Sequence, residues 1–213
     1  EVLHRDAEQN WTADDIYRRA NFALQSAWAH GTIALRTHLD SSAHLGPTAH
    51  AVMQQLKAEW QGKIELQTVS LCNVTNFAAH EARRIVELTA KNEASALGGF
   101  PQPGPNLTTE LEYLLAAARE LRLPVDLHVD ESALHHAECP YPVTCGHNCS
   151  LSIHDDARAA ETIALVKEAG IRIISLPLCN SYLQGRSRDT DEQPRTPQWR
   201  GLTRIHEFIQ TGV

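Results

Sequence analysis

A histidine and a glutamate three residues apart, His128 and Glu131, are the residues of this sequence that most clearly suggest chemistry. They follow the short run Val125-Asp126-Leu127, which reads as a buried strand. A neutral imidazole can bind a metal ion, and a carboxylate beside it can move protons to and from an activated water. The alternative is a histidine packed against a sheet and a glutamate that starts the next helix. By itself, the pair does not decide between the two.

Further polar residues stand where other predicted strands end. They are His38 and Asp40, Gln67, His147 and Asn180. Because the carboxyl ends of parallel strands all face one side of a barrel, we expect these side chains to converge on one site with His128 and Glu131.

Two of these positions have competing interpretations. Gln67 has a carboxamide that can bind the amide edge of a heterocycle, or it can be a satisfied polar residue inside the barrel mouth. The run Cys145-Gly146-His147-Asn148-Cys149 has cysteines four apart, but no second cluster follows that would complete a structural zinc site. We therefore expect these cysteines to be small core residues and His147 to face the site.

The elements that must position these residues alternate along the chain. Apolar periodicity, caps and glycines predict helices over residues 11–30, 48–60, 78–91, 107–121, 157–169 and 202–210. Strands are predicted over residues 32–39, 64–71, 94–100, 125–129, 143–145 and 171–176, and a polar surface loop over 184–198. This alternation predicts a parallel sheet with right-handed crossovers. About six strands are expected, whereas a full (β/α)8 barrel has eight. The prediction is therefore one partial TIM-barrel domain over residues 1–213 that lacks the first and last strands.

Composition narrows the class of protein. The chain has 213 residues and a net charge of −7, which argues against nucleic acid or an anionic membrane as a partner. Apolar runs stay well short of the ~20 residues that span a bilayer. Five cysteines without a dense framework predict a reducing, cytoplasmic setting. An open barrel exposes its sheet edges, so a homo-oligomer is expected.

The order of several short motifs resembles the amidohydrolase superfamily, and within it the metal-dependent hydrolases similar to cytosine deaminase. The motifs are Arg36-Thr37-His38-Leu39-Asp40, Leu66-Gln67-Thr68-Val69, His128-Val129-Asp130-Glu131, Gly146-His147, Leu176-Pro177-Leu178-Cys179-Asn180, Leu183-Gln184-Gly185-Arg186 and Arg200-Gly201-Leu202-Thr203. The resemblance runs over essentially the whole chain.

This resemblance implies a metal-dependent hydrolase that deaminates a small heterocycle, such as a nucleobase-like cyclic amidine. It implies that His128 binds one divalent metal ion, zinc or iron, that Glu131 shuttles protons, and that His147 orients the attacking hydroxide. Gln67, Asn180 and His38 are expected to bind the substrate. Alternatives are an amidohydrolase that cleaves a cyclic amide or another exocyclic amine, and a non-catalytic α/β module that binds a small molecule.

The sequence departs from the family pattern in three places. The His-x-His pair of the family's first strand and the ligating Asp of its last strand are both absent. Only fifteen residues separate Glu131 from His147, which leaves room for a reduced helix at about residues 132–138. We therefore expect this chain by itself to be an inactive or incomplete piece of the enzyme.

Overall fold

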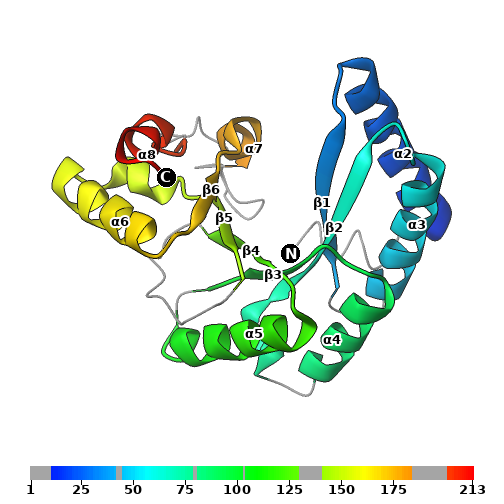
Figure 1. The fold of residues 1–213 in the computed structure, drawn as a ribbon, viewed down its shortest axis with the longest axis horizontal. Helices are drawn as coiled ribbons and strands as arrows, with labels where there is room; N and C mark the ends of the chain where they lie inside the picture. Colours follow the sequence, from blue (N-terminus) through cyan, green and yellow to red (C-terminus); the bar gives the residue numbers. More distant parts are fainter. Residues whose placement is uncertain (1–10, 42–44, 79–80, 103, 130–140, 184–200) are drawn as a thin grey trace, which may run out of the picture.

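The computed structural model describes residues 11–41, 45–78, 81–102, 104–129, 141–183 and 201–213. Its centre is a parallel sheet in which each strand pairs with the next along the chain. The strands are β1 (Ala34–Asp40), β2 (Glu65–Asn73), β3 (Ala96–Phe100), β4 (Val125–Val129), β5 (Val143–His147) and β6 (Arg172–Ile174). The sheet curves from β1 to β6 without closing, so β1 and β6 are its edges (Figure 1). The predicted incomplete barrel and its six strands are confirmed.

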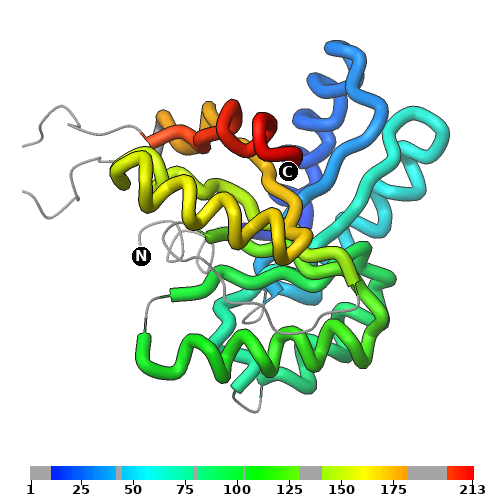
Figure 2. Tube along the Cα trace, turned by 60° about the vertical axis from the view of Figure 1, so that its left-hand side comes forward, coloured from blue at the N-terminus to red at the C-terminus, as the bar shows by residue number. Residues whose placement is uncertain are grey.

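Five of the described helices cover the convex side of this curved sheet (Figures 1 and 2). They are α2 (Ala13–Ala29), α3 (Leu45–Glu59), α4 (Glu81–Lys91), α5 (Leu107–Leu121) and α6 (Asp156–Glu168). Two short helices, α7 (Pro177–Leu183) and α8 (Ile205–Thr211), come after β6 in the chain, and the 3-10 helices η1 (Val74–Phe77) and η2 (Ser150–Ile153) follow β2 and β5. Helix α7 was not expected from the sequence. The predicted loop over residues 184–198 and the reduced helix predicted at about residues 132–138 both lie outside the described residues.

Local signals explain several of the helix boundaries. The Thr12 side chain accepts a hydrogen bond from the amide of Asp15 and caps α2, and Asp155 caps α6 by accepting from the amide of Arg158. Gly212 adopts a left-handed conformation with φ 86° directly after α8. A residue without Cβ adopts this conformation readily, so the helix ends where the sequence predicted.

Apolar side chains of the strands pack outward against the helices. One buried cluster joins Val125, Leu127 and Cys145 of β4 and β5 to α5, and another joins Leu39 and Leu66 of β1 and β2 to α2 and α3. Burying these faces is the main force that holds the helices on the sheet. The packing is close at β3: a Cβ on Gly99 would lie 2.5 Å from Leu114 Cδ1 of α5.

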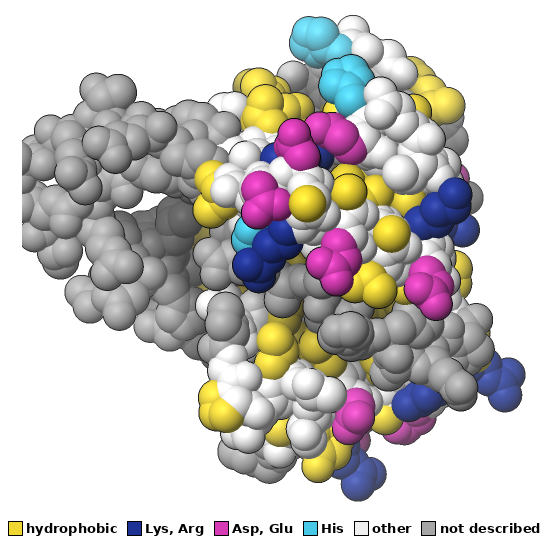
Figure 3. Space-filling model, turned by 90° about the vertical axis from the view of Figure 1, so that its left-hand side faces the viewer, with side chains coloured by type: hydrophobic (Ala, Val, Ile, Leu, Met, Phe, Trp, Pro, Cys, Tyr) yellow, Lys and Arg dark blue, Asp and Glu magenta, His cyan; other side chains and the backbone are white. Residues whose placement is uncertain are grey.

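The outer surface carries charges of both signs. On the side of the molecule where α6 and α8 lie, acidic, basic and hydrophobic side chains are interspersed (Figure 3). Within the described ranges, none of the helices has the length and apolar character that crossing a membrane requires.

Candidate metal centre

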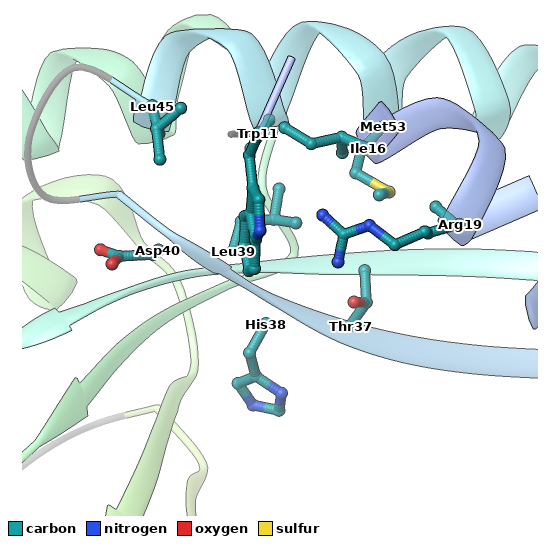
Figure 4. Close-up of a pocket in the computed structure, with 11 residues that line it drawn as sticks. Trp11, Ile16, Arg19, Thr37, His38, Leu39, Asp40, Leu45 and Met53 are labelled. Carbon is teal, nitrogen blue, oxygen red and sulfur yellow. The ribbon is translucent and has the colours of Figure 1, made fainter. Parts of the chain in front are cut away.

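Strand alternation sends a second set of side chains to the concave side of the sheet. In β4, Val125, Leu127 and Val129 belong to the outer core, so Asp126 and His128 point the other way. In β1, Leu39 packs outward, and Figure 4 shows the His38 ring on the opposite side of the strand from Leu39. The two strands therefore bring His38, Asp126 and His128 to one face.

These three residues form a group that can hold a metal ion. One ligand atom from each lies within 4.8 Å of the others. The His38 and His128 ring centroids are 4.3 Å apart, and His38 Nε2 is 3.1 Å from Asp126 Oδ1. Among the described residues, the buried His38 Nε2 lies beside the Asp126 carboxylate without a well-aligned hydrogen bond, so a cation bound between them would contact both. Two imidazoles and one carboxylate are a common ligand set for zinc and for iron(II).

Asp126 is buried and charged. Its side chain accepts a hydrogen bond from Arg36, with Nη1 2.9 Å from Oδ2. Burial by itself would raise the pKa of Asp126, but the hydrogen bonds and positive charges of His38 and Arg36 together bring its pKa below the usual value. A carboxylate is therefore present on this face over a wide pH range.

His128 is held neutral. Burial, and then the nearby His38 and His147, lower its pKa to about 4. A metal ligand has to be an unprotonated imidazole, so His128 is in the binding form at neutral pH.

A chain of contacts defines which nitrogen of His128 is left free. His147 Nδ1 lies 2.8 Å from the carbonyl oxygen Oδ1 of Asn180, so Nδ1 carries the hydrogen and donates it. His147 Nε2 is then an acceptor for His128 Nδ1, 3.3 Å away. This tautomer leaves His128 Nε2 with its lone pair exposed to a ligand. Asn180 is fully buried and its Nδ2 has no hydrogen-bond partner among the described residues, which leave this donor for a bound molecule.

The predicted site residues do not all lie together. The structure groups His38, His128, His147 and Asn180, whereas Gln67 is the third residue of the nine-residue strand β2 and not at its end as expected. Its Oε1 accepts two hydrogen bonds from Arg36, at 3.1 Å and 2.9 Å, and its Nε2 donates to Glu65 at 2.8 Å.

Two other expectations at strand ends have different outcomes. Asn180 was expected at the end of a strand, but it lies in α7, after β6. Glu131 lies outside the described residues, so its place beside His128 stays a prediction.

Cys145 and Cys149 are buried, as small core residues should be.

Asp126 and Arg36 were missed as site residues. The signal for Asp126 was in the sequence, because a charged residue two positions before His128 in an apolar strand has to share its face. Nothing in the sequence indicated that Arg36, ninety positions earlier, would be its partner.

A cavity of about 320 Å³ lies beside β1, and His38 is among the residues that line it. The rest of its wall includes Trp11, Arg19 and Met53 from the α2 and α3 side (Figure 4). The His38 ring points away from these three residues (Figure 4). The cavity and the histidine cluster therefore meet at His38, with the ring on the side of the cluster.

Comparisons with known proteins find similar enzymes. No family model matches the sequence. A pterin deaminase from Rhizobium rhizogenes is 39% identical over 227 aligned positions, which take in all of this chain and 51% of the relative. The chain therefore spans about half the length of this relative.

Solved structures show the same fold. A 5-methylcytosine deaminase from Klebsiella pneumoniae in complex with 5-fluorocytosine superposes with a TM-score of 0.74 and 23% identity, over 100% of this chain and 53% of that one. An N-isopropylammelide isopropylaminohydrolase from Burkholderia multivorans gives a TM-score of 0.53 and 21% identity, over 71% and 43% of the two chains. The chain therefore has the half-barrel fold found in these enzymes, and its sequence is similar to that of a pterin deaminase along the whole length of this chain.

Proposed function

We propose that this chain carries part of the active site of a metal-dependent hydrolase that deaminates a small aromatic heterocycle. The observation that carries the proposal is the 39% identity to a pterin deaminase along the entire chain. The substrate class is a ring with an amino group on a carbon next to a ring nitrogen, a feature that pterins and cytosines share.

Each residue of the proposed site has a distinct role. His38, Asp126 and His128 hold one divalent metal ion, zinc or iron(II), which lowers the pKa of a bound water when present. Glu131 moves a proton from the water to the leaving amine, so that the ring gains an oxygen and releases ammonia. His147 and Asn180 face the reacting group and orient it through their ring nitrogen and amide.

Gln67 has a smaller share in this arrangement than the sequence suggested. Both of its polar atoms already have partners in Arg36 and Glu65. Its role in binding substrate stays a prediction, and it requires that one of these hydrogen bonds be exchanged for one to the ligand.

Metal content tests the proposal directly. We expect about one zinc or iron per chain by elemental analysis after purification without chelators, and its loss in His128→Ala. The exposed His206 provides the control, because His206→Ala removes an imidazole that is not part of the metal-binding group and should keep the metal. Equal metal content in all three proteins would refute the assignment of His128, and a metal-free wild type would favour a non-catalytic binding module.

Ammonia release tests the substrate class. The metal-loaded chain, and the longer protein if the chain alone is inactive, should release ammonia from pterin or cytosine analogues. Release from neither, with metal bound, would refute deamination of this class.

We further infer association through the sheet edges. In the described part of the chain, β1 pairs only with β2 and β6 only with β5. Their outer backbone groups can pair with another strand, and small-angle scattering should therefore give a mass above 23.6 kDa. A monodisperse monomer would contradict the expected homo-oligomer.

A further inference from the structure

His147 reaches the concave face although its position in the strand directs it elsewhere. In β5, Val143 and Cys145 belong to the outer core, and His147 has the same parity. It also pairs in register with Val129, another outer residue. Yet His147 Nε2 lies 3.3 Å from Nδ1 of the inward-facing His128, so the backbone must turn at the end of β5.

The turn uses an unfavourable conformation. His147 has φ 70° and Asn148 has φ 48°, and both are residues with a Cβ. Left-handed backbone costs a residue such as His147 about 1–2 kcal/mol and an asparagine less, so the conformation at His147 persists where the surrounding structure holds it.

Four hydrogen bonds hold this turn. The Asn148 amide donates to Val129 O at 3.0 Å and to Gly146 O at 3.1 Å, and the Asn148 side chain donates to Cys145 O at 2.9 Å. The fourth comes from a distant segment: the Thr203 hydroxyl donates to the carbonyl of His147 at 2.6 Å. Thr203 is only 6% exposed, so water competes little for this carbonyl.

The segment that carries Thr203 is itself fixed over the end of β5. The next residue, Arg204, donates from Nε to Leu151 O at 2.9 Å and from Nη2 to His154 O at 2.7 Å. Both acceptors lie just beyond β5, in and after η2. Thr203 is therefore presented to His147 from an anchored backbone.

We propose that Thr203 is a positioning residue that sets the direction of the His147 imidazole by fixing its carbonyl group. Without the hydroxyl, the carbonyl side of the peptide between His147 and Asn148 loses its hydrogen bond to Thr203, and the peptide can rotate towards an ordinary strand conformation when the remaining bonds of Asn148 open. The ring then leaves Asn180 and His128. The use of His147 in catalysis rests on the proposed function, but its positioning does not.

The test compares three variants of the 213-residue chain by nitrogen-15 NMR of the histidine rings, without added metal. Thr203→Val removes the hydroxyl and keeps the shape, and Thr203→Ser restores a hydroxyl. Thr89→Val is the matched control, because the buried Thr89 hydroxyl also donates to a carbonyl at 2.6 Å, that of Ile85 in α4.

We expect His147 in the wild type to show one tautomer, with the hydrogen on Nδ1. Thr203→Val should change the His147 ring signals and mix the tautomers, while Thr203→Ser and Thr89→Val keep the wild-type pattern. Unchanged His147 signals in Thr203→Val, or equal changes in Thr89→Val, would overturn the proposal.

A folding failure is also decisive. If Thr203→Val and Thr203→Ala both fail to fold while Thr89→Val folds, Thr203 supports the fold as a whole and the positioning role is overturned. Because the NMR readout needs neither metal nor turnover, its failure leaves the proposed metal site standing. Failure of the metal test likewise leaves the positioning of His147 standing.

Discussion

Asp126 is the residue at which an ordinary ion pair and a metal site can be told apart. We consider Asp126→Asn, which keeps the shape and one oxygen acceptor but removes the charge. The Asp126 side chain is 2% exposed and that of Arg36 is 32% exposed. Removing one partner of a buried pair costs about 3–5 kcal/mol, and water reaches part of Arg36, so we expect a loss of about 2 kcal/mol in the free energy of unfolding without metal.

The metal-dependent part of the prediction separates the two roles. At a free metal concentration of about 100 times Kd, a site stabilises the folded wild type by about 2.7 kcal/mol. If loss of the carboxylate weakens the site a hundredfold, the same concentration stabilises the variant by only about 0.4 kcal/mol. Urea unfolding with and without zinc measures both numbers.

Asp156→Asn provides the control for this experiment. Asp156 also pairs with an arginine, Arg204, at 2.8 Å, but its side chain is 97% exposed. This substitution should cost under about 1 kcal/mol and leave the effect of zinc intact. If Asp126→Asn gains as much stability from zinc as the wild type, Asp126 is not a metal ligand and serves only Arg36.

Three further predictions concern packing, pH and proton transfer. Gly99→Ala should destabilise the fold by about 1–3 kcal/mol, because its Cβ would lie 2.5 Å from Leu114 Cδ1. Gly146→Ala is the control and should cost less, because the nearest atom to its Cβ would be 3.6 Å away. The urea midpoints of unfolding compare the two variants, and equal losses of stability would contradict the close packing at β3. Burial lowers the pKa of His50 to about 4, so the unfolded chain binds a proton between about pH 6.5 and 4 that the folded chain does not. The contribution of His50 to stability is therefore present above pH 6.5 and lost as the pH falls, by up to about 1.4 kcal/mol per pH unit, and His50→Asn should flatten that slope in unfolding curves. Glu131→Gln should abolish ammonia release by the complete enzyme and leave the metal content unchanged; near-normal turnover would exclude Glu131 as the proton shuttle.

Most of the secondary structure could be predicted because its signals are local. The strand over residues 125–129 and the helix over 107–121 have the predicted bounds, and Gly212 ends the last helix as expected. Helix α7 was missed since it has seven residues and follows directly on the short strand β6. So short a segment has little room for a periodic pattern.

The candidate site was only partly predictable. His38, His128 and His147 were recognised because polar residues that end apolar strands are unusual, and the structure brings all three together. The placement of Gln67 at a strand end was wrong, because it is the third residue of β2. The strand predicted over residues 64–71 already put Gln67 four positions before its end, so the predicted strand argued against that placement.

The sequence by itself determined the alternation of strands and helices, the parallel half-barrel and the residue types available for chemistry, since each depends on periodicity and composition along the chain. Only the tertiary structure decided which of these residues meet. The Arg36–Asp126 pair joins positions ninety residues apart, and Thr203 bonds a carbonyl fifty-six residues away. The left-handed turn at His147 goes against the local alternation of its strand. Such contacts arise when separate strands and helices pack around one core, and no local pattern encodes them.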